Sequence, residues 1–544
     1  MPSDWHVARS RVENCTGHCH KGHEKHPHLP NSGRSVLPKQ RYILAIDQGT
    51  TRTKAALIGE NGSVRGFGSA NVTRIFPHPG WVEEDPAQIW SSILIAVRTA
   101  MRRAKCRPKE IVGVGLDNQG ETVIAWDKRS GNPVYNAIVW QCRRTSELCA
   151  RLRRREGLER EIRRRTGLTI DPYFSATKIR WILDNVRRTK NFLRSSQLLL
   201  GTSDAWLVWK MSGRRRSITD YATASRTMLF NIHRMRWDPY LLRTFEIPEA
   251  PLPEVVPNCG ELAHTDPRSF LGIDAPISGL IVDQQAALFG QGCHSRGELK
   301  NTYGTGCFML MNTGNAPVSS HHGLLTTVAW VINGKKNYAL DGGVYTAGSA
   351  IDWLANGLGI IKSVAETEKM ANSIPNNGGV YFVPAFVGLA APYWDPIARG
   401  TIVGITDKTT AANLARATLE GIAYQVNEVL LCMNADSGLS AKSLKVDGGP
   451  TANRFLMQFQ ADISGISVKV PQISEMTVRG TALLAGLGID FWDDISKIVR
   501  SESQVVYAPK MSNRERTQLL DRWRRAVECS RAWGGEKKYF RVSS

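Results

Sequence analysis

Acidic, hydroxyl-bearing and glycine residues gather in short turns that follow apolar stretches of the chain. The clearest is Asp47-Gln48-Gly49-Thr50-Thr51, with Lys54 close behind it; Tyr303-Gly304-Thr305-Gly306 and Asp447-Gly448-Gly449 are turns of the same kind. A carboxylate at a strand end can face Mg²⁺, and glycine lets backbone N–H groups approach phosphate oxygens. Each turn alone is a weak signal, because similar sequences occur in many hairpins. Together they indicate phosphate chemistry.

The elements that must position these turns are predicted twice along the chain. Apolar runs predict strands at 42–47, 54–58, 63–72 and 111–116, and again at 300–303, 307–311, 324–332, 335–340 and 444–447. Asn333-Gly334 is a strong two-residue hairpin signal. A strand that turns straight back into a strand argues against a dinucleotide-binding unit, which would place a helix there. The repetition predicts a duplicated α/β fold with a nucleotide in the cleft between its halves.

Helices are expected between these strands. Asp85-Pro86-Ala87-Gln88 offers an N-cap, a first-turn proline and a glutamine three residues on, so a helix should run towards Met101. A long helix is expected after Thr410, and another through Phe455 and Phe459.

Length and composition describe an ordinary globular protein. The 544 residues suggest two to four domains, and 42% hydrophobic with 22% charged residues excludes wholesale disorder. Ten scattered cysteines favour a reduced, intracellular protein. No run reaches the roughly 18 apolar residues of a membrane helix. We therefore expect a cytoplasmic protein, and the C-terminus does not support attachment to the mitochondrial surface.

The charge balance is less ordinary, with 70 Lys and Arg against 49 Asp and Glu, a net +21. Much of the excess lies in 151–165 and in Arg214-Arg215-Arg216. Such runs can bind nucleic acid or an acidic membrane surface, but without interleaved aromatics we favour solvated helix faces and expect no nucleic-acid partner. Residues 1–40 hold six of the twelve histidines with Cys15 and Cys19. Zinc binding is one interpretation of this stretch, and a disordered tail is the one we favour.

Longer strings then resemble one family. They are Asp47–Thr51, Pro79–Glu83, Tyr135–Arg144, Asp171–Ser175, Ser225–Asn231, Asp283–Gly290, Asn301–Asn312, Ala391–Asp395 and Val446–Gly449. From about Arg41 to about Trp533 the chain resembles the glycerol kinases of the FGGY family of carbohydrate kinases. The resemblance implies two actin-like (RNase H-type) domains with a nucleotide cleft between them, and MgATP-dependent phosphorylation of glycerol to sn-glycerol 3-phosphate. It also implies a homodimer or homotetramer.

The resemblance divides the chain into four parts. Residues 1–40 would be the tail, 41–295 the domain for glycerol and phosphate, 296–510 the nucleotide domain, and 511–544 a C-terminal helical tail.

It also implies roles for individual residues. Asp283 would be the general base, with a helix-start carboxylate as the alternative, and Asp47 would help hold Mg²⁺. Glycerol hydroxyls would be bound by Glu121, Tyr173, Asp283 and Gln284. Trp140 and Phe308 would pack on its carbon atoms, unless they are ordinary core residues. The nucleotide and its phosphates would be lined by Thr50, Thr51, Lys54, Thr305, Gly348, Asp352, Gly449 and Asn453.

Departures from the family pattern concern the glycerol site most. Gly120 stands where the pattern has an Arg that clamps glycerol hydroxyls, so affinity or rate should be weaker and Glu121 should lose a neighbouring positive charge. Val282 stands where Gly is usual, Asp352 where Gln is, and Lys54 where the bacterial pattern has Arg. Three interpretations stay open: a working glycerol kinase, a catalytically impaired paralogue, and a kinase for another small polyol. If Gly120 is the lesion, Gly120→Arg should raise kcat/KM for glycerol.

Overall fold

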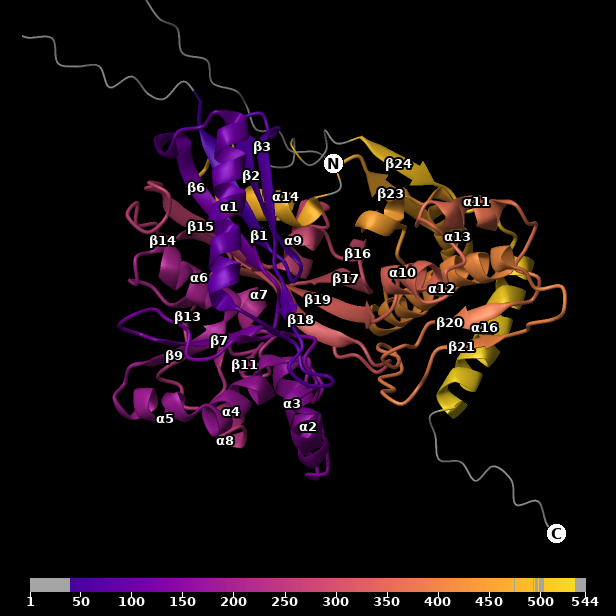
Figure 1. Ribbon diagram of the computed structural model, residues 1–544, viewed down its shortest axis with the longest axis horizontal. Coiled ribbons are helices and arrows are strands. Elements are labelled where there is room, and N and C mark those ends of the chain that lie inside the picture. The colour runs from indigo at the N-terminus through magenta and orange to yellow at the C-terminus, as the bar shows by residue number, and fades with distance from the viewer. Residues whose placement is uncertain (1–39, 474, 493, 495–497, 499–502, 534–544) are drawn as a thin grey trace, which may run out of the picture. The chain divides into compact units, whose positions relative to one another are not determined.

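The computed structural model describes residues 40–473, 475–492, 494, 498 and 503–533. The Cys- and His-rich stretch of the N-terminal tail lies outside these residues. Two large sheets dominate the part described (Figure 1). The first has the order β14-β15-β6-β1-β2-β3 and the second the order β18-β19-β17-β16-β22-β23-β24.

The first sheet is built from residues before 283. Its strands are β1 (Tyr42–Gln48), β2 (Arg52–Gly59), β3 (Val64–Asn71), β6 (Ile111–Asn118), β14 (Cys259–His264) and β15 (Pro276–Val282). β1 pairs antiparallel with β2 and parallel with β6, and β15 continues the sheet parallel to β6. The hairpin predicted after Asp47 is therefore confirmed.

The second sheet repeats this pattern. Its strands are β16 (Leu299–Tyr303), β17 (Cys307–Gly314), β18 (Leu325–Ile332), β19 (Lys335–Val344), β22 (Ser443–Asp447), β23 (Ser467–Pro471) and β24 (Gln504–Tyr507). Each sheet has three antiparallel strands followed by two parallel strands and one antiparallel strand, and β18 is an addition to the second. The duplication predicted from the hairpins is confirmed in strand order and direction.

Smaller sheets and short helices occupy segments between the strands of the two large sheets. A third sheet joins β4 (Arg74–Ile75), β5 (Glu83–Glu84), β8 (Ala137–Ile138), β7 (Val123–Asp127) and β9 (Leu198–Thr202). Two-stranded pairs are β10 (Ile218–Asp220) with β13 (Glu254–Val256), β11 (Phe230–Asn231) with β12 (Arg236–Trp237), and β20 (Tyr381–Val383) with β21 (Thr401–Val403). The helices here are α2 (Ser146–Arg153), α3 (Leu158–Thr166), α4 (Ser175–Asn185), α5 (Arg187–Arg194), α6 (Ser203–Met211), α7 (Tyr221–Ala224) and α8 (Pro239–Thr244).

The Arg-rich run 151–165 forms the end of α2 and most of α3. Glu161 pairs there with Arg164 and Arg165, at 2.8 and 3.2 Å. Arg165 also pairs with the buried Asp238 at 3.0 Å, so the run is partly solvated and partly tied to the fold. No helix within the described ranges combines the length and apolar composition needed to cross a bilayer.

Helix α1 (Pro86–Ala104) begins where the sequence predicts. Asp85 accepts a hydrogen bond from the Ala87 N–H at 2.9 Å, and Pro86 occupies the first turn. Gln88 does not complete a capping box, because its side chain accepts from the Thr73 N–H at 2.8 Å. α1 packs on β2 and β3, where Gly66 and Gly68 let the helix backbone approach closely (Figure 1).

The remaining helices belong to the second half of the chain. They are α9 (Asp283–Gly290), α10 (Gly348–Asn356), α11 (Glu366–Asn372), α12 (Ala411–Ser437), α13 (Arg454–Ser464), α14 (Met476–Leu487) and α16 (Asn513–Trp533). The one-turn segments η1 (Pro108–Glu110) and η2 (Gly449–Ala452) are 3₁₀-helices. Helix α16 is anchored by Trp523, which is fully buried and stacks on Tyr424 with ring centroids 5.0 Å apart.

Helix α14 packs against α9 and the first sheet although it follows the second sheet in sequence. The two helices approach closely because glycines face each other: a Cβ at Gly480 would lie 1.9 Å from the Ala286 carbonyl oxygen. Thr481 on α14 also donates to the buried Asp117 carboxylate on β6 at 2.6 Å. The position of α9 therefore depends on residues nearly 200 positions away.

We predict that Gly480→Ala forces α9 and α14 apart and lowers the free energy of unfolding by about 3 kcal/mol or more, since a backbone atom blocks the added methyl. Urea denaturation followed by circular dichroism measures this. Gly449→Ala is the matched control, because a Cβ at Gly449 meets no atom within 4 Å, and it should change stability by less than about 0.5 kcal/mol. Equal stability of the two variants would contradict the packing account.

Candidate active site

Asp283 lies where β15 passes directly into α9. Val282 is the N-cap, and Asp283 is the first helical residue, with its Oδ1 accepting from the Gln284 N–H at 2.7 Å. Burial, together with the nearby carboxylates of Glu121 and Asp47, raises the pKa of Asp283 to about 7. A carboxylate with a pKa near neutrality suits a general base, because it accepts a proton readily and is still largely ionised.

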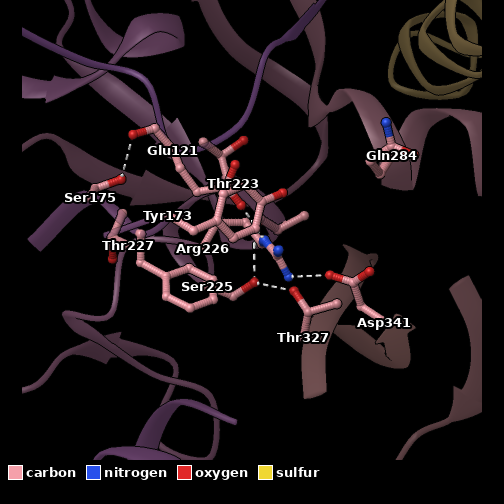
Figure 2. Close-up of polar contacts among 12 residues, drawn as sticks. Glu121, Tyr173, Ser175, Thr223, Ser225, Arg226, Thr227, Gln284, Thr327 and Asp341 are labelled. Carbon is pink, nitrogen blue, oxygen red and sulfur yellow. Dashed lines mark hydrogen bonds and ion pairs between the residues drawn. The ribbon is translucent and has the colours of Figure 1, made fainter. Parts of the chain in front are cut away.

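Glu121 is held by a buried ion pair (Figure 2). Arg226 Nε donates to Glu121 Oε1 at 2.7 Å, and Arg226 Nη1 lies 2.8 Å from Asp341 Oδ2. Glu121, Arg226 and Asp341 are 3%, 3% and 6% exposed. Burial opposes the charge on Arg226, but Asp341 and Glu121 outweigh it and raise the arginine pKa. Glu121 therefore has a positive neighbour in Arg226, although position 120 supplies none.

The backbone at Glu121 is also unusual, with φ of 57° in the left-handed region that non-glycine residues seldom adopt. Such strain persists only where surrounding contacts hold it, and it is common at functional sites. Ser175 supplies one such contact by donating from Oγ to the Glu121 carbonyl at 3.1 Å (Figure 2).

Three aromatic rings stand together beside these groups. Trp140 lies 5.6 Å from Tyr173 and 6.0 Å from Phe308 between ring centroids, at interplanar angles of 77° and 82°. None of the three is fully buried. Trp140 comes from the first half of the chain and Phe308 from β17 of the second, and Trp140 Nε1 donates to Thr50 Oγ1 at 2.9 Å. The structure thus joins the predicted aromatic pair to Tyr173 and to the Asp47 turn.

Gln284 has a partner that the sequence did not suggest. Lys300 Nζ, fully buried on β16, donates to Gln284 Oε1 at 2.6 Å and to Thr302 Oγ1 at 2.9 Å. Burial lowers the pKa of Lys300, while Asp447 and Asp283 oppose this shift. Lys300 thereby orients the amide of Gln284 and places a cation near the base.

The turn after β1 brings a second set of charges together. Asp47 is buried, and Lys54 Nζ lies 3.5 Å from Asp47 Oδ2 and 2.5 Å from Glu475 Oε2. Burial opposes the charge on Lys54, but Asp47 and Glu475 prevail and raise its pKa. Asp117 stands opposite Asp47 in the parallel β1–β6 register, and its Oδ1 has no hydrogen-bond partner among the described residues.

The residues predicted for the nucleotide in the second half of the chain lie on the Thr305 turn, on α10, on η2 and at the start of α13. The Thr305 turn contacts the start of α10, where Ala347 N–H donates to Thr305 O at 2.8 Å and Gly348 N–H to Gly304 O at 3.0 Å. Asp352 on α10 is exposed, and Gly449 has open space at its Cα. Asn453 caps α13 by accepting from Leu456 N–H at 2.9 Å, so its side chain has a structural task.

Two of the recognisable strings, Pro79–Glu83 and Tyr135–Arg144, form one structural cluster with Trp181. Glu83 accepts from the Tyr135 hydroxyl at 2.7 Å, from Asn136 at 2.8 Å and from Arg144 at 2.6 Å. The Arg144 guanidinium lies 3.9 Å from the Trp81 ring centroid and 4.5 Å from that of Trp181. These buried contacts support the segment that carries Trp140.

Comparisons with known proteins agree with this geometry. The N-terminal and C-terminal domain models of the FGGY family of carbohydrate kinases match residues 42–290 and 299–489. A glycerol kinase of Geobacillus sp. is 48% identical over 91% of this chain and 100% of its own length. Glycerol kinase 2 of Thermotoga maritima is 49% identical over 91% and 99%.

Solved structures show the same likeness. The crystal structure of Plasmodium falciparum glycerol kinase with ADP has a TM-score of 0.84 at 35% identity and covers 90% of this chain and 98% of that one. A gluconate kinase from Lactobacillus acidophilus, at 20% identity, has a TM-score of 0.79 over 92% and 99% and shares the fold.

We predict that Arg226→Met lowers the free energy of unfolding by about 3–5 kcal/mol, because Glu121 and Asp341 would be left as buried, unpaired charges. Arg226→Lys should be intermediate, since one ammonium cannot reproduce the guanidinium fork. Chemical denaturation measures both. In the control, Arg164→Met breaks an exposed pair with Glu161 and should cost at most about 1 kcal/mol. A loss no larger in Arg226→Met than in this control would refute the ion-pair account.

Proposed function

The chain belongs to the FGGY family of carbohydrate kinases, and from that premise we propose that it transfers the terminal phosphoryl group of ATP to glycerol, giving sn-glycerol 3-phosphate and ADP. The observation that carries the proposal is the grouping around Asp283. Glu121 and Asp47 are close enough to raise its pKa. Tyr173, Trp140 and Phe308 form one aromatic cluster near the Glu121–Arg226 pair.

We propose that Asp283 takes the proton of the attacking hydroxyl. As that proton leaves, the glycerol oxygen forms a bond to the γ-phosphorus, and the bond from this phosphorus to the bridging oxygen breaks and releases ADP. The transition state asks little covalent chemistry of the protein, so positioning and charge neutralisation contribute most.

In the proposed glycerol site, polar and apolar residues would bind different parts of the substrate. Glu121, Tyr173, Gln284 and Asp283 offer polar groups to the three hydroxyls, and Trp140 and Phe308 offer an apolar wall to the carbon atoms. Arg226 and Lys300 do not need to touch glycerol. Their bonds to Glu121 and Gln284, at 2.7 and 2.6 Å, hold those side chains in place before the substrate arrives.

The phosphates would lie against the turns after β1 and β16. We propose that Thr50, Thr51, Lys54 and Thr305 face the transferred phosphoryl group. Lys54 is engaged by Glu475 and Asp47, so phosphate oxygens would compete with these carboxylates. Gly348, Asp352, Gly449 and Asn453 would line the nucleotide. Glycerol and phosphate would belong mainly to 41–295, and the nucleotide to 296–510.

The residues near Asp47 fit a Mg²⁺ ion that would be bound by the protein and by the phosphates of ATP together. The described residues include no cluster of three or more His, Cys, Asp or Glu side chains arranged to hold a metal ion. Mg²⁺ commonly takes only one or two carboxylates, with phosphates and water completing its shell. Asp47 would supply a carboxylate, and the unpartnered Oδ1 of Asp117 beside it would accept from a metal-bound water. When bound, the ion would neutralise charge on the phosphates.

The three interpretations that the sequence left open now differ in support. An impaired paralogue need not keep Asp283 at a pKa near neutrality or Asp47 beside a lysine, and both are present. We therefore propose a working kinase acting on glycerol. We also propose that it works in the cytoplasm as a homodimer or homotetramer, which light scattering of the purified protein would test.

We predict that Asp283→Asn lowers kcat by about 10²–10⁴-fold, the usual contribution of a positioned base, in an assay coupling ADP release to NADH oxidation with glycerol titrated. Asp274→Asn, which changes an exposed carboxylate, should leave kcat within two-fold, roughly the effect expected of a surface change. Glycerol-dependent ADP release that survives unchanged in Asp283→Asn would remove Asp283 from the mechanism.

We predict that kcat/KM for glycerol falls as pH drops through about 7, because the base must be ionised and burial raises the Asp283 pKa to about 7. Below that value the rate should decrease about ten-fold per pH unit. The profile should be measured with saturating MgATP. A flat profile down to pH 5.5, about 1.5 units below the expected pKa, would contradict this role.

A further inference from the structure

Gly120 is buried, and its backbone does not require glycine. Its φ lies outside the left-handed region, unlike that of Glu121 beside it. A Cβ built on Gly120 would lie 2.9 Å from Cγ2 of Val282. Apart from its chain neighbours, no other heavy atom of the described residues comes within 4 Å of that Cβ. Any side chain at position 120 must therefore displace a single methyl group.

That methyl group cannot move aside easily. Val282 is 2% exposed, ends β15, and pairs with Asn118 in β6. It is also packed in a buried cluster that includes Ile281, Ala286 and Leu288. A β-branched side chain has few χ1 alternatives, so rotation of Val282 would trade one contact for another.

We propose that Gly120 and Val282 form one coupled pair that sets how tightly glycerol is held. The Val282 methyl occupies the space that a side chain at 120 needs, and Val282 directly precedes Asp283. The two positions depart from the family pattern together and in opposite directions: Gly stands for Arg at 120, and Val for Gly at 282. In this chain the Val282 methyl lies beside Gly120, and the substrate-binding Arg that the resemblance implies at 120 is absent.

The position of Val282 changes what is expected of a substitution that places Arg at position 120. The sequence alone predicts that Gly120→Arg raises kcat/KM, but the 2.9 Å contact means that this variant must first displace Val282. Val282 directly precedes Asp283, so any displacement is passed to the base. Gly120→Arg by itself should therefore fail to improve the enzyme, whereas Gly120→Arg with Val282→Ala should succeed, because alanine lacks the obstructing Cγ2.

A double-mutant cycle on melting temperature tests the contact without any assay of activity. Gly120→Ala adds only the Cβ and should lower the melting temperature by about 2 °C or more, because it overpacks a buried site. In a Val282→Ala background the same change should cost less than half as much. Ile281→Val is the matched control: it removes one methyl from the adjacent buried residue, which does not contact position 120, and the penalty should persist in full. If Gly120→Ala lowers the melting temperature equally in the unaltered, Val282→Ala and Ile281→Val backgrounds, the coupling between positions 120 and 282 is refuted.

The kinetic arm rests on the proposed function. In the double variant Gly120→Arg/Val282→Ala, KM for glycerol should be at least ten-fold lower than in Val282→Ala, because one or two charged hydrogen bonds have an effect of about that size. The value of kcat should change less than about three-fold. Gly120→Arg alone should show no such gain. An equal KM gain with and without Val282→Ala would refute the coupling, and no gain in the double variant would refute the part concerning glycerol. If the unaltered protein shows no glycerol-dependent turnover, the proposed function fails. The double-mutant cycle on melting temperature still tests whether positions 120 and 282 are coupled.

Discussion

The buried ion pairs of Arg226 are the constraint on which the glycerol site depends most. The guanidinium lies between Glu121, which follows a strand of the first sheet, and Asp341, on β19 of the second. Removing two carboxylates and an arginine from water is costly, and the cost is repaid only if all three stay in place. The residues that would bind glycerol are therefore tied to both halves of the molecule before any substrate binds.

The same buried surroundings raise the pKa of the proposed base, Asp283. Asp283 begins α9, whose position is set by close glycine contacts with α14, and its pKa is raised by burial and by the carboxylates of Glu121 and Asp47. Because Arg226 neutralises Glu121, the like-charge contribution to Asp283 is moderated. Lys300, bonded to Gln284, places a second buried cation near the site. Burial, cations and carboxylates thus set the proton affinity of Asp283 together.

Local patterns in the sequence predicted the elements well. Most strands of both sheets, the helix after Asp85 and the Asn333-Gly334 hairpin depend on neighbouring residues, with Asn333 and Gly334 at φ of 50° and 73° as such a turn requires. The duplication followed from them. Strands β14, β15, β23 and β24 were not predicted. The Cys- and His-rich tail could not be judged, since it lies outside the described residues.

The partners within the site could not be predicted in this way. Arg226 stands in the recognisable string Ser225–Asn231, but nothing local indicates that it pairs with residues 105 and 115 positions away. Lys300 and Glu475 were missed for the same reason. Each departure at 120 and 282 was visible alone, and only the fold shows that a Cβ at 120 would meet Val282. Position 120 supplies no positive charge to Glu121, as expected, but Arg226 reaches Glu121 from a distant segment.

The most direct measurement of the central claim is ³¹P NMR of the purified protein with MgATP and glycerol. The account predicts that a glycerol 3-phosphate resonance grows in step with the β-phosphate of ADP, and that both stop growing when glycerol is omitted. ADP accumulating with inorganic phosphate alone, whether or not glycerol is present, would contradict it.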